Sequence, residues 1–329
     1  MRGQQGRITI IDIAEECGCS KTTVACAMDE RTAHKVAQKT REKIYEAVRR
    51  LGYLPNRSAK ALRLRRTYTI GIMLPEPANS FYGNIVLSLQ RQLARHGYTA
   101  LFAFWETYDD VETIQRALDM LLSRGVDGII TGQLSGVHFE KCGVPVIRWQ
   151  EPGDYDSFSS FPHMENAYER LLEILQSKGC RNYALITNAL DAGRAAIIRK
   201  LFRRKRIPLR DKFLIDGVTS PHKACEAMQL LLRGGTLPDA VLANNDYIAL
   251  AAMAEAMKNG IRIPEQMKFV GFDGIPESEY LHPSLTTFFV PPDQIAEKLI
   301  SLLFRRMENP DAAFMSLSLM PELIIRDSI

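Results

Sequence analysis

The sequence predicts an all-α head joined by a hinge helix to an α/β body of two doubly wound parallel-sheet subdomains. Three observations lead to this fold class. The chain has 329 residues, more than one hydrophobic core usually supports. Residues 1–66 carry 15 Lys and Arg against 7 Asp and Glu, whereas the rest of the chain carries 27 against 31. Beyond residue 68, short β-branched runs alternate with amphipathic helical stretches, which is typical of parallel sheets.

The composition narrows the classes of protein to consider. A basic head on a mildly acidic body favours contact with a polyanion over a charged leader that binds nothing. The longest uncharged apolar-rich run, near 247–254, is too short to span a bilayer, so no membrane contact is expected. The opening residues, MRGQQGRITI, lack the apolar stretch of a secretory signal. We therefore expect a reducing cytoplasm and free thiols.

The head begins with two short helices separated by a tight turn. Thr9 is expected to cap the first helix, with Asp12 in its first turn, and Ser20 to cap the second. Gly18 supplies the left-handed backbone that a sharp turn needs. Apolar positions share one face of each helix: Ile10, Ile13, Ala14 and Cys17 in the first, and Val24, Ala27 and Met28 in the second. This order of small, glycine and aliphatic residues is the spacing of a helix-turn-helix.

Three of the six cysteines, Cys17, Cys19 and Cys26, stand within ten positions of this segment. A zinc site would need a fourth ligand; the nearest histidine is His34, and no second C-x-C or H-x-H follows. We expect Cys17 and Cys19 to pack as small apolar residues, with metal binding or redox chemistry as the weaker alternative. Cys26 belongs to the outer face of the second helix.

A third helix is expected from about Lys39 to Leu51, after which Pro55 excludes further helix. Asn56 can cap a short new helix that reaches Leu62. Four positive charges follow closely, at Lys60, Arg63, Arg65 and Arg66. A strand signature then begins a new domain at Tyr68.

The segments ITIIDIAEECGCSKTTVACAMD and KTREKIYEAVRRLGYLPNRSAKAL, with the strand after them, resemble the head and hinge of the LacI/GalR family of bacterial transcription regulators. The resemblance extends from about residue 8 to the C-terminus. It implies a DNA-binding domain at 1–54, a hinge and linker at 55–66, and an effector-binding and dimerisation domain at 67–329. The body's N-subdomain would comprise about 67–158 and 291–315, and its C-subdomain about 159–290 and 316–329.

The resemblance also implies how the head meets DNA. A homodimer would place two second helices in successive major grooves of a near-palindromic operator. The residues implied are Thr9, Ser20, Lys21, Thr22, Thr23, Cys26, Asn56, Arg57 and Leu62. Leu62 matches the wedge that enters the minor groove and kinks the duplex. Relatives commonly have Ser then Arg where this chain has Ala25 and Cys26, so we predict a half-site that departs from the usual consensus.

Alternating strands and helices are expected through the body. The strand candidates are 69–74, 99–105, 127–131, 144–149, 183–187, 213–216, 240–243 and 268–272, with amphipathic helices such as 110–125 and 247–260 between them. Ligands of such folds lie beyond the carboxyl ends of the strands. At these ends stand the residues that the resemblance implies for the effector: Phe81, Tyr82, Arg194, Asn245 and Asp273. A carboxylate, an amide, a guanidinium and aromatic rings suit a carbohydrate or a purine-like base.

Other interpretations of these residues stay open. Phe81 and Tyr82 can be helix-packing residues, and Asp246 is more simply a helix cap. The run RRKR at 203–206 is expected to be a solvated helix end rather than a second nucleic-acid patch. His163, Met164 and Val290 stand where relatives have polar residues, which weakens the case for an ordinary free hexose.

Two other classes of protein are alternatives to a DNA-binding regulator. An enzyme is disfavoured because neither Asp246 nor Asp273 has a nearby histidine, and no nucleophile, phosphate-loop or metal motif appears. No cofactor is therefore expected. A solute-binding protein would share the two-lobed body but not the basic head. The expected partners are double-stranded operator DNA, a small-molecule effector and a second copy of the chain, acting in the cytoplasm at the nucleoid.

Overall fold

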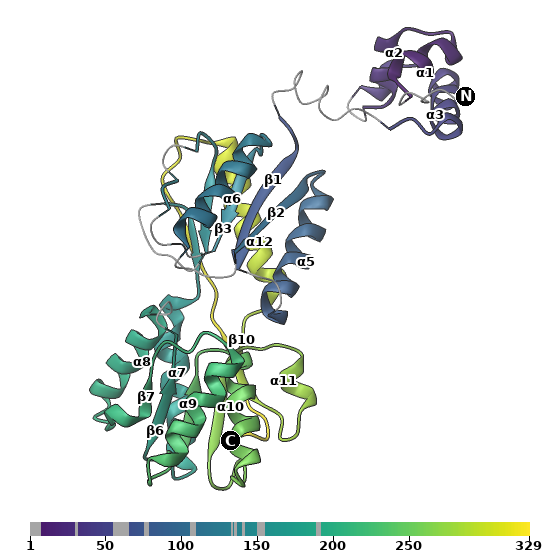
Figure 1. Cartoon of the computed structure of the whole chain (residues 1–329). Helices are drawn as coiled ribbons and strands as arrows, with labels where there is room; N and C mark the ends of the chain where they lie inside the picture. Colours follow the sequence, from purple (N-terminus) through teal and green to yellow (C-terminus); the bar gives the residue numbers. More distant parts are fainter. Residues whose placement is uncertain are drawn as a thin grey trace. The chain divides into compact units, whose positions relative to one another are not determined.

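The computed structural model describes residues 8–29, 32–54, 66–75, 79–105, 110–132, 134, 137–139, 142–149, 155–188 and 192–329. The chain divides into two compact units, Met1–Thr67 and Tyr68–Ile329, the head and the body (Figure 1). The hinge helix expected at 56–62 lies outside the described residues, and so do the contacts predicted for Asn56, Arg57 and Leu62.

The head is helical, as the sequence predicts. Its elements are α1 (Ile10–Cys17), α2 (Lys21–Ala27), a 3₁₀ turn (Ala33–Lys35) and α3 (Gln38–Leu51). Ile13, Val24 and Ile44, one from each α-helix, are fully buried and form the centre of a small core. Gly18 has φ 61° and Gly52 has φ 64°, so glycines end α1 and α3 in the left-handed conformation.

The cysteines of the head are free thiols in this structure. Cys17 is buried in the core and its thiol donates to the Lys43 carbonyl at 3.7 Å, while Cys19 is half-buried. Burial raises the pKa of the Cys17 thiol, which keeps it neutral. Within the described ranges, no group of three or more His, Cys, Asp or Glu side chains could hold a metal ion.

The first sheet of the body has six parallel strands in the order β11-β5-β4-β3-β1-β2. Its strands are β1 (Thr69–Pro75), β2 (Thr99–Trp105), β3 (Gly128–Thr131), β4 (Val146–Trp149), β5 (Ser157–Ser159) and β11 (Ser316–Ser318). The helices of this lobe are α5 (Ser80–Arg95), α6 (Val111–Ser123) and α12 (Pro292–Glu308). β11 aligns with β5 in this sheet, so the subdomain boundary expected after residue 315 is too early.

The second sheet has the order β12-β10-β9-β8-β6-β7, parallel except for the antiparallel pair β10–β12. Its strands are β6 (Tyr183–Ile186), β7 (Leu214–Ile215), β8 (Ala240–Ala243), β9 (Lys268–Asp273), β10 (Thr286–Phe289) and β12 (Glu322–Ile324). Its helices are α7 (Phe161–Ser177), α8 (Ala192–Arg204), α9 (Pro221–Arg233), α10 (Asp246–Lys258), α11 (Glu277–Tyr280) and a 3₁₀ turn (Asp211–Phe213). The prediction of two doubly wound sheets is confirmed.

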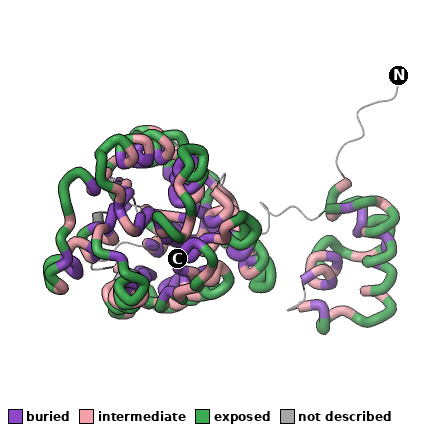
Figure 2. Tube along the Cα trace, turned by 90° about the horizontal axis from the view of Figure 1, so that it is seen from below, coloured by how far each residue is buried: buried purple, intermediate pink, exposed green. Residues whose placement is uncertain are grey.

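One hydrophobic core continues from the first lobe into the second. Ile72 and Leu89 of the first lobe belong to the same buried cluster as Leu171 of the second. Met164 and Val290 are also buried in it, at 0% and 2% exposure, so the apolar residues that replace the expected polar ones pack in the interior. Figure 2 shows how the buried residues gather inside the body.

The basic run at the end of α8 pairs with acidic residues of α7. Arg204 contacts Glu165 and Glu169, and Lys205 contacts Glu169 and Glu173. The three glutamates stand four residues apart and therefore share one face of α7. Two of the four positive charges of this run are thus paired within the lobe, and Arg203 and Arg206 are exposed.

None of the described helices combines the length and the apolar character needed to cross a bilayer.

Candidate DNA-binding and ligand-binding sites

The second helix of the head presents its polar face outward. Ser20 caps α2 by accepting a hydrogen bond from the Thr23 backbone N–H at 3.1 Å, as predicted. Lys21 and Thr22 are exposed, whereas Thr23 and Cys26 are half-buried. The exposed side chains of α2 are therefore those of its first turn, at the end where the helix dipole attracts anions.

Thr9 acts first as a helix cap. It forms a capping box with Asp12: the Thr9 backbone N–H donates to the Asp12 carboxylate at 2.6 Å, and the Asp12 N–H donates to the Thr9 hydroxyl at 3.4 Å. Hydrogen bonds from the backbone and side chain of Thr9 lower the pKa of Asp12. The predicted cap is confirmed, and the hydroxyl of Thr9 also donates to Asp12 at 2.8 Å.

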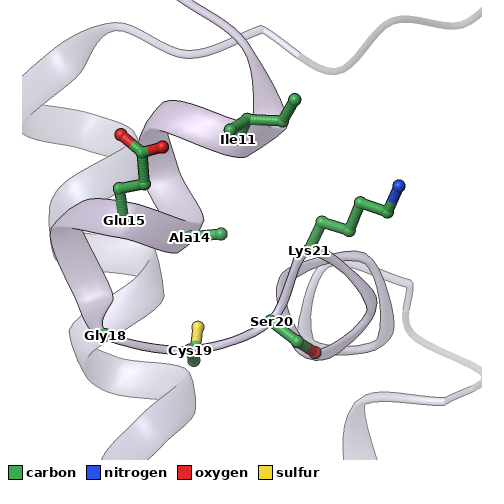
Figure 3. A pocket seen from close by; sticks show the side chains of 7 residues that line it. All are labelled: Ile11, Ala14, Glu15, Gly18, Cys19, Ser20 and Lys21. Carbon is green, nitrogen blue, oxygen red and sulfur yellow. The ribbon is translucent and has the colours of Figure 1, made fainter.

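A shallow hollow of about 560 Å³ lies between α1 and the start of α2 (Figure 3). Ile11, Ala14, Glu15, Gly18, Cys19, Ser20 and Lys21 line it. Ile11, exposed by 53%, and Lys21 stand at opposite sides of this hollow in Figure 3. An exposed aliphatic side chain at the start of α1 and an ammonium at the start of α2 thus lie at the rim of this hollow.

In the first lobe of the body, three aromatic rings meet at the carboxyl ends of the strands. Phe81 and Tyr82 begin α5 after β1, and their ring centroids lie 5.8 Å and 6.0 Å from that of Trp149, the last residue of β4. Phe81 is buried in the core, as the packing interpretation expected, while Tyr82 is half-buried. Trp149 is 3% exposed, and its indole N–H has no hydrogen-bond partner among the described residues.

In the second lobe, Arg194 lies over an aromatic ring at the end of β9. Its guanidinium carbon is 3.8 Å from the ring centroid of Phe272, and Nη1 donates to the Asn244 carbonyl. These contacts bring together residues from α8, from the end of β8 and from β9. The guanidinium is therefore fixed in orientation at the carboxyl edge of the sheet.

The helix cap after β8 is a different residue from the one that the sequence suggested. The prediction that Asp246 caps α10 is wrong, because Asn245 is the cap and accepts from the Ile248 N–H at 2.9 Å. Asp246 is the first helical residue and is fully buried. It accepts hydrogen bonds from the Thr287 hydroxyl at 2.5 Å and from the Ile275 N–H at 2.9 Å. Burial raises its pKa to about 7.

Asp273 ends β9 in a strained conformation. Its φ of 109° is in the region that favours glycine, and Gly274 follows with φ 70°. A side chain at Gly274 would collide with Phe289, whose Cδ2 lies 2.5 Å from the position of an added Cβ. Asp273 itself is 7% exposed. Such strain in a non-glycine residue concentrates at functional sites.

The strand ends of the two lobes face each other in the body. The Ser80 hydroxyl, after β1, donates to the Glu277 carboxylate, after β9. The residues following these two strands therefore meet, and the aromatic trio and the Arg194–Asp273 group belong to facing edges. Sequence reasoning missed Trp149, Phe272 and Asn244, although each stands at or beside the end of a predicted strand.

Comparisons with known proteins agree in both parts of the chain. The family "Bacterial regulatory proteins, lacI family" matches residues 9–56, and "Periplasmic binding protein-like domain" matches residues 172–329. The HTH-type transcriptional repressor PurR of Erwinia tasmaniensis is 27% identical over 337 residues, covering 98% of this chain and 96% of that protein. PurR of Actinobacillus pleuropneumoniae serotype 3 is 26% identical, with 98% of each chain covered.

Solved structures match over the same extent. The lac repressor dimer bound to operator and the anti-inducer ONPF superposes with a TM-score of 0.85 at 23% identity, covering 98% of this chain and 99% of that one. A complex of the transcriptional regulator CelR with cellobiose superposes with a TM-score of 0.68 at 24% identity, covering 98% and 100%. At these identities the likeness establishes the fold: a helical head and two parallel-sheet lobes.

Proposed function

The chain belongs to the LacI/GalR family of bacterial transcription regulators, and on that premise we propose that it is a repressor whose homodimer binds a near-palindromic operator under control of a small-molecule effector. The observation that carries the proposal is the head: a capped α2 that presents Lys21 and Thr22 outward in a basic domain. Such a regulator acts in the cytoplasm, on the nucleoid, and the proposal assigns it no catalytic step.

Recognition of DNA divides between bases and phosphates. Lys21 and Thr22 contact base edges, Thr23 and Asn56 help at phosphates, and Leu62 wedges the minor groove. Cys26 replaces the arginine of relatives, so a bidentate grip on guanine is lost at that position. The operator half-site therefore differs from the family consensus at that position. The lost contact would have contributed about 1–3 kcal/mol of discrimination against the wrong base.

The test of DNA binding starts from a random duplex library and the full chain. We expect selection to return a near-palindrome and Lys21→Ala to change base preference within each half-site. Arg49→Ala is the matched control: Arg49 is exposed on α3, so this variant loses the same charge without altering preference. A chain that prefers no sequence over random competitor at low salt would instead be a solute-binding protein with no DNA role.

The effector is sugar-like or nucleobase-like and lies where the strand ends of the lobes face each other. Phe81, Tyr82 and Trp149 offer ring faces and a buried N–H donor, and Arg194 and Asp273 offer charged groups from the opposite lobe. Asn245 uses its side-chain oxygen as a cap, and among the described residues its amide nitrogen donates no hydrogen bond, which leaves it for a ligand.

Calorimetry against sugars and purines tests this site. Arg194→Ala should abolish the heat of whichever compound binds, whereas Arg203→Ala, an exposed position on the same helix α8, should leave it unchanged. Binding that survives Arg194→Ala would place the effector elsewhere.

Dimerisation is assigned to the β2 edge of the first sheet. Leu87 of α5 is 61% exposed, and Phe104 of β2 and Val111 of α6 are each 39% exposed, beside a strand with one unpaired edge. Leu87→Asp should give a monomer in sedimentation. Leu230→Asp, equally exposed on α9, should leave the dimer intact.

A further inference from the structure

The two helices of the helix-turn-helix end without positive charge of their own. Neither α1 nor α2 has a basic residue in its last turn. The carbonyl groups at the end of a helix need hydrogen-bond donors from outside the helix. In this head the donors for the last residue of each helix come from α3.

At the end of α1, Cys17 and Lys43 make two reciprocal contacts. The Lys43 ammonium donates to the carbonyl of Cys17, the last residue of α1, at 3.0 Å. The Cys17 thiol in turn contacts the Lys43 carbonyl at 3.7 Å. A positive charge at a helix C-terminus also complements the helix dipole. α1 is thereby fixed to α3.

At the end of α2 the donor is a tyrosine. The hydroxyl of Tyr45 donates to the carbonyl of Ala27, the last residue of α2, at 2.7 Å. The hydroxyl of Thr32 donates to the preceding carbonyl, that of Cys26, at 3.0 Å. Tyr45 is 42% exposed, so its ring is only partly covered while its hydroxyl reaches the end of α2.

The apolar contacts of α2 are too few to fix its orientation, which therefore depends on these hydrogen bonds. The helix has only seven residues and buries two small side chains, Val24 and Ala27. Contacts of this size resist separation of α2 from α1 better than they resist its rotation. Reading bases requires side chains to be held within about 0.5 Å and 10–20° of the productive geometry.

We propose that Tyr45 is a positioning residue for base recognition, holding the C-terminal end of α2 so that Lys21 and Thr22 meet the bases in one register. The proposal rests on the DNA-binding function proposed above. Lys43 and Tyr45 stand two residues apart on α3, so one turn of this helix sets the angle between both helices of the motif.

Tyr45→Phe removes only the hydroxyl, and Tyr53→Phe is its control. Tyr53 is buried in the same core, and among the described residues its hydroxyl makes no hydrogen bond. Binding is measured by fluorescence anisotropy with the duplex selected by the wild-type chain and with a random duplex, across a series of salt concentrations. Circular dichroism melts of each variant report whether the head stays folded at the temperature of measurement.

We expect Tyr45→Phe to weaken binding to the selected duplex about fivefold, the value of one hydrogen bond, with affinity for random DNA and its salt dependence unchanged. Thr32→Val should act in the same direction, and Tyr53→Phe should change neither affinity. A parallel loss on both duplexes would mean a structural role or a phosphate contact and overturns the proposal, as does undiminished discrimination. If the wild-type chain selects no sequence, the DNA-binding function itself is overturned. If the wild-type chain selects a sequence and Tyr45→Phe keeps the same preference, only the role of Tyr45 is overturned.

Discussion

Replacing Asp246 by asparagine should change how the stability of the body depends on pH. The carboxyl group is fully buried, and burial raises its pKa from 3.8 to about 7. A carboxyl whose pKa is higher in the folded than in the unfolded chain contributes stability that is complete below the unfolded pKa and is lost as pH rises through the folded value. Because one pKa unit corresponds to about 1.4 kcal/mol, the contribution of Asp246 to the free energy of unfolding should fall on the order of 4 kcal/mol between pH 4 and pH 7.

The assay is urea unfolding of wild type and Asp246→Asn, followed by tryptophan fluorescence. Both tryptophans, Trp105 and Trp149, belong to the body, so the signal is independent of the head. The stability of wild type minus that of Asp246→Asn should decrease by about 1.4 kcal/mol per pH unit between pH 4.5 and 6.5 and level off above 7.5. Two-state behaviour is checked by circular dichroism in the same samples.

A second carboxyl provides a control of opposite sign. The hydrogen bond from Thr187 lowers the pKa of Asp216, with a further contribution from Arg199. Its stabilisation is present above the unfolded pKa and is lost as pH falls, so the deficit of Asp216→Asn should disappear in acid. If the Asp246→Asn difference were independent of pH, the carboxylate would be charged in the folded protein, and the argument from burial would be refuted.

Three further changes test contacts within the body. Gly271→Ala should destabilise by about 3 kcal/mol or more, because its Cβ would lie 2.1 Å from Oδ1 of Asp246; the urea midpoint measures this, and a change under 1 kcal/mol would contradict the packing. Asp156→Ala should cost about 3–5 kcal/mol, because it leaves the Arg306 guanidinium buried without its carboxylate, 2.6 Å away in the native protein; adding Arg306→Met should restore much of the loss. Ser80→Ala should leave stability within about 0.5 kcal/mol but alter effector affinity in calorimetry, since it removes an exposed bond between the lobes; an unaltered affinity would exclude that bond from effector response.

The sequence predicts most of the fold because hydrophobic periodicity and helix caps are local. The strands β2 and β8 coincide with their predicted ranges, and α1 has the predicted cap and glycine end. The strands β5, β10, β11 and β12 were not predicted. They have only three or four residues, too few for a clear alternating pattern, and their pairing depends on segments far apart in the sequence.

The candidate site was predictable only in part. In the run ANND, Asn245 and Asp246 can both cap a helix, and the choice depends on where β8 ends and what lies beneath α10. Gly271 leaves room there for the Asp246 carboxyl, and no local sequence pattern predicts this contact. Trp149 closes a strand that the sequence predicts, so the strand-end rule already pointed to it. Tyr45 had no signal, because its role depends on a bond to α2.

One loop connects the charged groups of the second lobe with the first lobe. Asp246 accepts a hydrogen bond from the Ile275 N–H. Ile275 lies two residues beyond the strained Asp273 and two residues before Glu277, which accepts a hydrogen bond from Ser80. A ligand that engages Asp273 therefore acts on the segment that carries the bond between the lobes. Because the core is continuous across the lobes and resists gradual deformation, we expect the response to a ligand to come from such discrete bonds rather than from bending of the sheets. Replacing Asp246 perturbs the same loop from beneath, so its effect on stability and its effect on effector affinity should appear together.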